Sequence, residues 1–229
     1  MIALWLKNHL AHVKIFLFLA SSLPLLRMVL AYFTDALGPN PLETLTRSTG
    51  FWSLFFLMLT LSVTPSRKLL ADIARWRCVR YGKRVSDWNW LVRLRRQLGL
   101  WSFVYALLHG WIFLAFDAAY DWAVFWQTCQ EKPYLFLGLT ALLMLVPLAF
   151  TSANIMIRLL GRYWLWLHRT VYLIAVLVLA HDYLQLKSGS ELLKIEFVVI
   201  SLLLLYRLGL YLGWARRWDG ANGLEVKDR

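Results

Sequence analysis

Long apolar stretches alternate with short polar segments along most of the chain. A transmembrane helix needs about 20 mainly apolar residues to cross the hydrocarbon core of a bilayer. Six stretches reach or approach that length, at 13–33, 46–64, 93–116, 134–152, 163–185 and 195–213. The second stretch is the weakest, because its continuous apolar run begins only at Phe51. The pattern predicts an all-α membrane protein, a bundle of six transmembrane helices.

The composition excludes a soluble globular protein. Of 229 residues, 60% are hydrophobic and 17% are charged, and the mean hydropathy is +0.55, whereas soluble domains carry about 25% charged residues. Two cysteines are too few for a disulfide scaffold. We expect an N-terminal segment 1–12, a transmembrane domain 13–213 with a polar loop at 65–92, and a tail 214–229.

The basic residues are unevenly distributed between the two sides of the membrane. If the six spans alternate in direction, one side receives both termini and the loops 65–92 and 153–162. Together with Lys14, Arg93, Arg95 and Arg96 at the adjoining span ends, that side collects 18 of the 25 Lys and Arg residues. Positively charged loops stay in the cytoplasm. Both termini and the basic loop are therefore predicted to be cytoplasmic, and the first span, which lacks a cleavage site, is predicted to be a retained anchor.

Three of the five histidines lie inside predicted spans, where ionisable groups are costly and usually functional. His168 and His181 are 13 residues apart on the fifth span, which corresponds to about 20 Å along a helix. His109 lies on the third span, which runs in the same direction and reaches the depth of His181 if its helix begins near Arg93. Two neutral imidazoles that face each other between helices are the axial ligands of a b-type haem.

Other interpretations of the histidines fit the residues less well. A single intramembrane histidine is often bonded to a neighbouring helix without further function. A zinc site requires three or four nitrogen, sulfur or carboxylate ligands, and Asp182 is the only such side chain near His109 and His181. A proton relay in a transporter would more often include acidic residues at mid-membrane. We therefore favour haem.

The cytoplasmic half of the predicted bundle has no second histidine pair. A haem ligated by His168 would need a partner 13 or 14 residues before His109, where Arg96 and Arg95 stand. Arginine stays protonated and does not ligate iron. Either His168 binds a second haem with a weak or borrowed ligand, or the arginines hold an anionic group such as a flavin phosphate or haem propionates. Ordinary positive-inside residues are the simpler alternative.

Five segments with distinctive motifs follow one another between residues 37 and 187. They are LGPNPLETLTRSTGFWSL, LSVTPSRKLL, RRQLGLWSFVYALLH, KPYLFLGLTALLMLVPLAFTS and GRYWLWLHRTVYLIAVLVLAHDYL. In this order they resemble the MsrQ family, also called YedZ. The family is the haem-binding membrane subunit of the bacterial periplasmic methionine sulfoxide reductase system, and it is similar to ferric-reductase-like transmembrane proteins.

The resemblance implies an electron conduit in the bacterial inner membrane. It implies haem b on His109, His168 and His181, and FMN near Arg95 and Arg96. Electrons would come from the quinone pool or from a cytoplasmic flavin reductase. They would pass to a periplasmic molybdopterin reductase of the MsrP type, which reduces the sulfoxide and so repairs oxidised periplasmic proteins. This subunit would have no sulfoxide-reducing residues of its own.

Two features depart from related redox proteins. Ferric reductases and superoxide-generating oxidases append a cytoplasmic flavin and nicotinamide domain, whereas only 16 residues follow the sixth span here. The segment 76–90, WRCVRYGKRVSDWNW, is longer than in compact MsrQ sequences. We expect it to form either an interfacial amphipathic piece or a docking surface.

Overall fold

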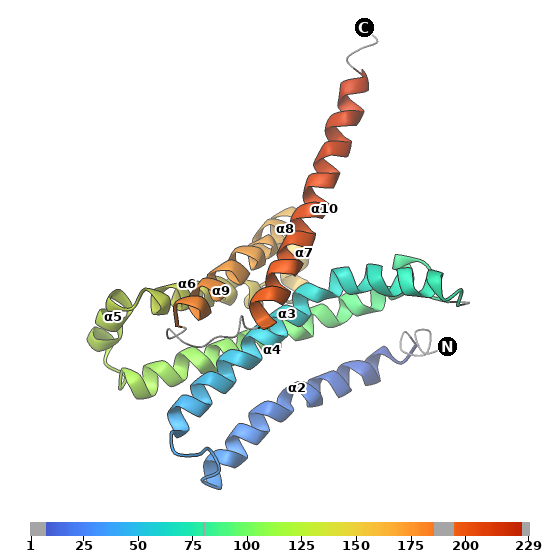
Figure 1. Cartoon of the computed structure of the whole chain (residues 1–229). Coiled ribbons are helices and arrows are strands. Elements are labelled where there is room, and N and C mark those ends of the chain that lie inside the picture. The colour runs from blue at the N-terminus through green and yellow to red at the C-terminus, as the bar shows by residue number, and fades with distance from the viewer. Residues whose placement is uncertain (1–7, 80, 186–194, 226–229) are drawn as a thin grey trace. The chain divides into compact units, whose positions relative to one another are not determined.

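The computed structural model describes residues 8–79, 81–185 and 195–225, with side chains up to Gly213. Every regular element in these ranges is a helix (Figure 1). Residues up to 191 form one compact unit, and residues from 192 form a second. The second unit contains α10 (Ile195–Glu225), whose first 19 residues, Ile195–Gly213, are apolar enough to cross a membrane.

Six helical segments of the described chain are long and apolar enough to span a membrane, as the hydropathy pattern predicts. In the first unit they are α2 (Leu10–Phe33), α3 (Pro41–Trp76), α4 (Val92–Ile112) with its flanking turns, α6 (Pro133–Phe150), and the pair α8 (Arg162–Arg169) and α9 (Val171–Gln185). The all-α fold with six candidate spans is thus confirmed. The start of α4 at Val92 also agrees with the start near Arg93 that the depth of His109 requires.

Helix α4 is the centre of the first unit. It packs most closely against α3, while α6 packs most closely against α9, and α4 also contacts α6 (Figure 1). Between α3 and α4, Ser53 Oγ donates to the Ser102 carbonyl over 3.1 Å, and Ser102 Oγ donates to the Ser53 carbonyl over 2.9 Å. These reciprocal hydrogen bonds fix the register of the two antiparallel helices in a region without competing water.

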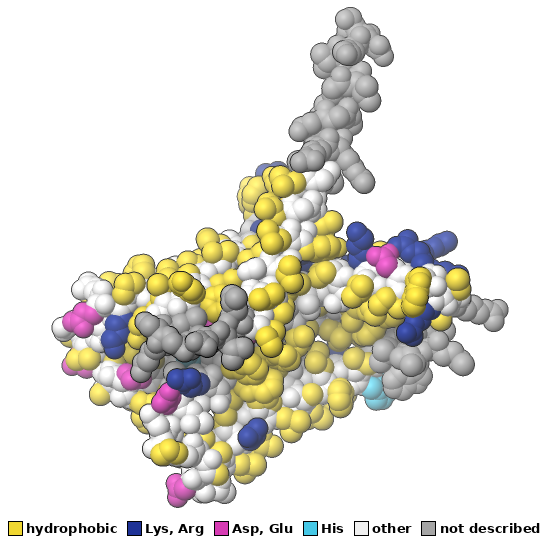
Figure 2. All heavy atoms as spheres, in the orientation of Figure 1, with side chains coloured by type: hydrophobic (Ala, Val, Ile, Leu, Met, Phe, Trp, Pro, Cys, Tyr) yellow, Lys and Arg dark blue, Asp and Glu magenta, His cyan; other side chains and the backbone are white. Residues whose placement is uncertain are grey.

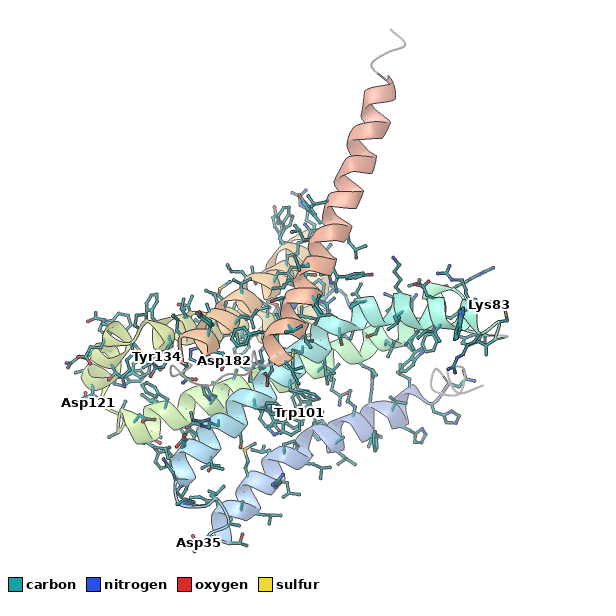
Figure 3. The ribbon with its side chains drawn as sticks, viewed as in Figure 1. Asp35, Lys83, Trp101, Asp121, Tyr134 and Asp182 are labelled. Atoms are coloured by element: carbon teal, nitrogen blue, oxygen red, sulfur yellow. The ribbon has the colours of Figure 1, made fainter. Side chains whose placement is uncertain are left out.

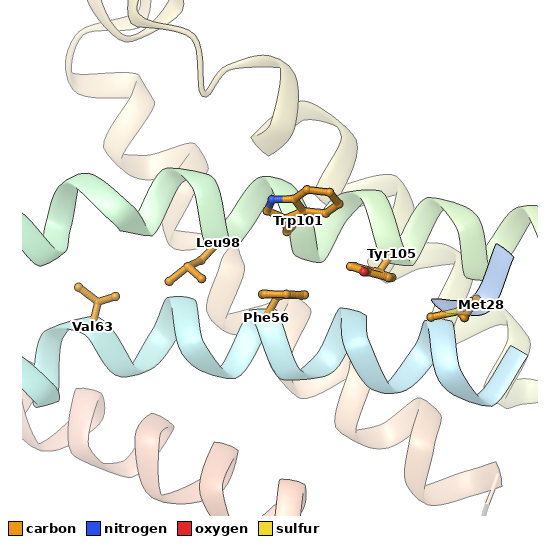
Figure 4. Packing of buried hydrophobic residues seen from close by; sticks show 6 residues of the cluster. All are labelled: Met28, Phe56, Val63, Leu98, Trp101 and Tyr105. Carbon is orange, nitrogen blue, oxygen red and sulfur yellow. The ribbon is translucent and has the colours of Figure 1, made fainter. Parts of the chain in front are cut away.

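A core cluster of buried residues lies where α2, α3 and α4 meet (Figure 4). Phe56 and Tyr105 stack with ring centroids 5.6 Å apart, and Trp101 lies 5.9 Å from Tyr105. The other members of the cluster are Met28, Val63 and Leu98. Aromatic pairs at these separations add packing energy beyond the area they bury, which keeps α4 rigid one turn before His109.

The Tyr105 hydroxyl is inserted into the backbone of α2. It accepts a hydrogen bond from the Leu25 amide over 3.1 Å and donates to the Ser21 carbonyl over 2.8 Å. These two backbone groups are four residues apart and would bond each other in a regular helix. Pro24 stands between them, and a proline ring displaces the preceding turn. Tyr105 therefore bonds backbone groups on both sides of Pro24 and joins α2 to α4.

Helix α3 continues past the predicted end of the second span, into the polar stretch 65–92. Helix α3 passes through Pro65 and ends only at Trp76, so the first part of that stretch is helical. Its length, about 54 Å at 1.5 Å per residue, exceeds the hydrocarbon core of about 30 Å. The extension persists because Ala71 and Ala74 lie three residues apart and are buried. Hydropathy alone marks the end of a span and misses a helix that continues into the polar region.

The segment 76–90 turns back towards α3 after Trp76. It forms the short 3₁₀ helix η1 (Val85–Leu91), which packs on α3 and α4. Trp90 is buried, and Arg67 donates a hydrogen bond to the Asn89 side chain. Trp88 Nε1 donates to the Gly82 carbonyl over 2.8 Å. The segment is thus packed against the long helices at least in part.

The opposite end of the first unit carries a helix that the hydropathy pattern does not predict. Helix α4 ends in a π-helical turn, η2 (Phe113–Asp117), and α5 (Trp122–Glu131) follows. Asp121 caps α5 by accepting from the Ala123 and Val124 amides. At ten residues, α5 is too short to span a bilayer, and its exposed Trp122 and Trp126 are typical of a helix at the membrane interface.

The two ends of the first unit differ in charge, as Figure 2 shows. We call the end where α3 stops and α4 starts the basic end; its charged residues include Arg67, Lys68, Arg75, Lys83, Arg84, Arg93, Arg95 and Arg96. We call the end that holds α5 the acidic end; its charged residues include Asp35, Glu43, Asp117, Asp121 and Glu131. Figure 3 marks Lys83 at the basic end and Asp35 and Asp121 at the acidic end.

The two cysteines lie at opposite ends of the first unit, and both are free thiols. Cys78 is exposed at the basic end, whereas Cys129 on α5 is buried. Burial raises the pKa of the Cys129 thiol. Residues 1–7, the predicted outer loop 186–194 and the side chains of the tail from 214 lie outside the described part of the chain.

Candidate functional site

His109 and His181 come together near the acidic end of the first unit. His109 lies in the last turn of α4, and His181 lies in α9. Their ring centroids are 6.2 Å apart, and the ring planes are nearly perpendicular, at 88°. Both side chains are partly buried. Two helices that are far apart in the sequence thus bring one imidazole each to the same place in the bundle.

Each imidazole is hydrogen-bonded to a backbone carbonyl of a third or fourth helix. His109 Nδ1 lies 3.0 Å from the Thr46 carbonyl oxygen on α3. His181 Nδ1 lies 2.6 Å from the Tyr134 carbonyl oxygen at the start of α6; Figure 3 marks Tyr134. A carbonyl oxygen only accepts hydrogen bonds, so Nδ1 carries the proton in both rings. In the neutral form of each ring the lone pair is then on Nε2, on the side away from the carbonyl.

This arrangement is typical of histidines that ligate a metal. A ligating histidine almost always donates its other ring N–H to a carbonyl, a carboxylate or water, which fixes its tautomer and orientation. A metal–imidazole bond of about 2.0–2.1 Å places two rings on opposite sides of one ion with centroids roughly 6 Å apart. The observed 6.2 Å agrees with that separation. Two imidazoles on facing helices of a bundle fit the axial positions of a haem iron.

A metal held entirely by protein side chains is disfavoured. Among the described residues, no group of three or more His, Cys, Asp or Glu side chains is placed to hold one ion. Zinc sites use at least three protein ligands. A metal bound by this pair would take its remaining ligands from a cofactor, as in a porphyrin.

His168 has different surroundings. It lies near the end of α8, and its Nδ1 is 3.2 Å from the Trp164 carbonyl of the same helix. Its ring stacks on the Trp164 indole, with centroids 4.0 Å apart. Trp164 is in turn held by a hydrogen bond of 3.0 Å from its Nε1 to the Thr151 carbonyl. No second imidazole is described beside His168.

The two candidate arginines are not equivalent. Arg95 is close enough to His168 to interact with it electrostatically. Arg96 is exposed, and its Nη1 donates to Asn154 Oδ1 over 2.9 Å, at the start of α7 (Asn154–Leu160). Arg95 and His168 therefore lie near each other, as their positions along α4 and α8 suggest. Arg96 instead joins α4 to the start of α7.

Sequence analysis does not identify the groups that orient the histidine pair. The acceptors are main-chain carbonyls of Thr46 and Tyr134, and a main-chain atom leaves no signature in the residue type. The glycines beside the rings, Gly50 and Gly138, resemble any other small residue in a membrane helix. The register of α3 against α4 and of α6 against α9 is needed before either can be assigned.

Comparisons with known proteins agree with this architecture. Residues 49–179 match the family model described as "Ferric reductase like transmembrane component". The protein-methionine-sulfoxide reductase heme-binding subunit MsrQ of Herminiimonas arsenicoxydans is 41% identical over 209 residues, which cover 90% of this chain and 87% of that protein. The MsrQ of Ralstonia nicotianae is 39% identical over 214 residues, covering 92% and 88%. That of Azospira oryzae is 40% identical over 204 residues, covering 88% and 80%.

These matches extend over most of the chain and include the helices that carry the histidine pair. Identity of this size over nearly the full length of several relatives establishes common descent and a common fold. The chain is a multi-pass membrane protein that belongs to the MsrQ family.

Proposed function

We propose that the protein is the haem-binding, electron-transferring membrane subunit of a protein-methionine-sulfoxide reductase system. The single observation that carries this proposal is the His109 and His181 pair, with its 6.2 Å separation and its two carbonyl-bound Nδ1 atoms. The relatives named heme-binding subunit support the same cofactor.

His109 and His181 would hold a haem b through their Nε2 atoms. When bound, the haem supplies a one-electron carrier inside the membrane. The carbonyls of Thr46 and Tyr134 would hold Nδ1–H of each imidazole and so fix the tautomer and the orientation that present Nε2, and their hydrogen bonds would increase the basicity of the ligating nitrogens. The surrounding apolar residues lower the local dielectric, and burial of this kind is one of the levers that set a haem potential.

The charge asymmetry supports an orientation for the electron path. The basic end carries the arginine-rich segments, which the positive-inside rule places in the cytoplasm. The histidine pair is then on the periplasmic side of the inner membrane. Electrons would enter from quinol or a reduced flavin donor and leave towards a periplasmic molybdopterin reductase of the MsrP type. Reduction of a sulfoxide to a thioether and water takes two electrons and two protons, and that chemistry belongs to the partner.

The surroundings of His168 favour an anionic group over a second haem with two histidine ligands. His168 has a cation beside it in Arg95, and a tryptophan covers one of its faces. A guanidinium binds phosphate or carboxylate through paired hydrogen bonds. We therefore propose that Arg95, with a smaller part for Arg96, binds the phosphate of FMN or the propionates of a haem at the basic end, and that His168 contacts the same group.

Spectroscopy of the purified protein tests the proposed function. We expect a Soret band, reduced α and β bands of a b-type haem, and at least one haem per chain by pyridine haemochrome. In proteoliposomes, quinol should reduce this haem, and the purified partner reductase with methionine sulfoxide should reoxidise it. Protein that folds in the membrane but contains no haem would end the proposal and favour a histidine-based proton pathway.

A further inference from the structure

Two glycines lie directly against the histidine pair. A Cβ atom added at Gly138 on α6 would lie 2.7 Å from His181 Nδ1 and 2.9 Å from Cε1. A Cβ added at Gly50 on α3 would lie 3.2 Å from His109 Cε1 and 3.3 Å from Nδ1. Glycine inside a helix is unfavourable by about 1 kcal/mol relative to alanine. Its presence at both positions therefore needs a compensating cause.

The same geometry occurs on both sides of the site. Thr46 precedes Gly50 by four residues, and Tyr134 precedes Gly138 by four. In an α-helix the carbonyl of residue i points at the amide of residue i+4, so a side chain that reaches this carbonyl from outside must pass over residue i+4. His109 reaches the Thr46 carbonyl across Gly50, and His181 reaches the Tyr134 carbonyl across Gly138. The missing Cβ atoms leave room for the rings.

Close packing of helix backbones is the usual reason for glycine in a membrane helix, and it does not explain these two. The three nearest atoms to the added Cβ are all imidazole atoms at Gly50, and the same is true at Gly138. Gly110, the neighbour of His109 on α4, differs: its added Cβ would meet only the Leu142 Cδ2 methyl, at 2.9 Å. That methyl ends a flexible side chain and can move aside.

We propose that Gly50 and Gly138 are positioning residues for the haem ligands, each opening a helix surface so that an imidazole can donate Nδ1–H to the carbonyl one turn earlier. The proposal rests on the proposed haem function and goes beyond it, because it names what sets the tautomer and the orientation of both ligands. A methyl group at either site separates the ring from its carbonyl. The ligating Nε2 then becomes less basic and the ring plane turns.

Three alanine variants of the full-length protein test this role. Gly138→Ala creates the shortest contact, 2.7 Å, and Gly50→Ala creates one of 3.2 Å, whereas Gly110→Ala is the matched control on the helix of His109. The readouts are haem per chain, the low-spin ferric EPR signal, which depends on the angle between the two imidazole planes, and the midpoint potential from a redox titration. A merely structural glycine would change protein yield without shifting the spectrum or the potential of the haem that remains.

We expect a larger change in haem binding where the added Cβ lies closer to the imidazole. Removal of a partner that orients a metal ligand costs about 10–100-fold in affinity, so Gly138→Ala should lose most of its haem. Gly50→Ala should keep haem with a shifted EPR signal and a higher potential, since weaker imidazole donation stabilises ferric iron less. Gly110→Ala should match the wild-type protein. If Gly138→Ala does not fold, Gly50→Ala decides the matter.

Each unfavourable result has a distinct meaning. An unchanged EPR signal and potential in Gly50→Ala would overturn the positioning role while the haem function stands. The same changes in Gly110→Ala as in Gly50→Ala would also overturn it, because the effect would then belong to helix packing in general. Absence of haem from the wild-type protein would instead remove the proposed function.

Discussion

The histidine pair at the acidic end and His168 at the basic end have the same side chain and different support. His109 and His181 each donate to a carbonyl of another helix, so four helices determine their positions. His168 is bonded to a carbonyl of its own helix, is stacked on Trp164 of the same helix, and also interacts with the Leu148 backbone on α6. The first arrangement places two rings 6.2 Å apart. The second holds one ring between its own helix and α6, beside a cation.

The difference teaches what an intramembrane histidine needs in order to ligate a metal strongly. A free imidazole can rotate about its side-chain torsions and exchange tautomers, and fixing it at the moment of binding costs affinity. A carbonyl on a separate helix removes both freedoms before the ligand arrives. A hydrogen bond to a carbonyl of the same helix, as at His168, orients the ring but does not bring a second imidazole opposite it. We expect the two regions to respond differently to the same substitution.

Removal of the histidines gives the largest expected effect. His109→Ala and His181→Ala each delete a proposed iron ligand, which costs more than loss of an orienting partner at about 10–100-fold, so haem per chain should fall below roughly a tenth of the wild-type value. His168→Ala is the matched control and should keep the haem of the histidine pair. Pyridine haemochrome and optical spectra measure the result. Equal haem content in all three variants would contradict the proposal that His109 and His181 ligate the haem and that His168 does not share this role.

The two arginines sharpen the description of the basic end. Arg95→Ala removes the cation beside His168. Because a hydrogen bond to a charged group is worth about 1.5–3 kcal/mol, the affinity of the protein for FMN should fall about 10–100-fold. Arg96→Ala should have a smaller effect on this affinity, because the Arg96 guanidinium already donates a hydrogen bond to the Asn154 side chain. Flavin extraction and a fluorescence titration with FMN measure both, with Arg93→Ala as the control. A larger loss in Arg96→Ala would reverse the assignment.

Tyr105 tests whether support of the histidine pair extends one turn along α4. Tyr105→Phe leaves the Ser21 carbonyl and the Leu25 amide unpaired in a buried region, at a cost of about 1–3 kcal/mol in unfolding free energy. Thermal unfolding in detergent should report this loss. A haem spectrum that keeps its wild-type shape would show that the cluster supports the fold without tuning the ligands.

A double-mutant cycle provides the control for Tyr105. Pro24→Ala allows α2 to form the regular bond between Leu25 and Ser21, so Tyr105→Phe should cost less in that background. The difference between the two backgrounds measures the coupling of the hydroxyl to the proline. Strict additivity would mean that the hydroxyl does not compensate for Pro24.

The cysteines compare the two ends with the smallest disturbance of the protein. Burial raises the pKa of the Cys129 thiol, so less thiolate is present at neutral pH, and the thiolate is the form that reacts. Exposed Cys78 should therefore react about tenfold or more faster with a maleimide at pH 7, and the rate at Cys129 should rise with pH above neutrality. Mass spectrometry of the labelled protein measures both rates, with the variant Cys78→Ser as the control.

The same reagents test the orientation of the ends. A membrane-impermeant maleimide should reach Cys78 in inside-out vesicles and not in intact spheroplasts, because the basic end is proposed to face the cytoplasm. Labelling of Cys78 from the periplasmic side would reverse the topology and the direction of the proposed electron path.

Most of the fold was predictable because membrane insertion is a local property of the chain. About 20 apolar residues suffice to define a span, and all six were found. The end of α3 and the helix α5 were not, because both extend beyond the hydrocarbon core, where Ala71 and Ala74 pack on neighbouring residues and Asp121 caps a short interfacial helix. A hydropathy profile includes neither side-chain packing outside the membrane nor helix capping.

By itself, the sequence determined that the chain crosses a membrane, that its two sides differ in charge, and that His109 and His181 share a depth, because each of these follows from counting residues along helices. Only the tertiary structure decided that the two rings approach to 6.2 Å, that the carbonyls of Thr46 and Tyr134 accept hydrogen bonds from their Nδ1 atoms, and that Gly50 and Gly138 leave them room. Rotation and register of one helix against another depend on side chains far apart in the chain, and the hydrogen-bonding groups of the main chain are the same at nearly every position.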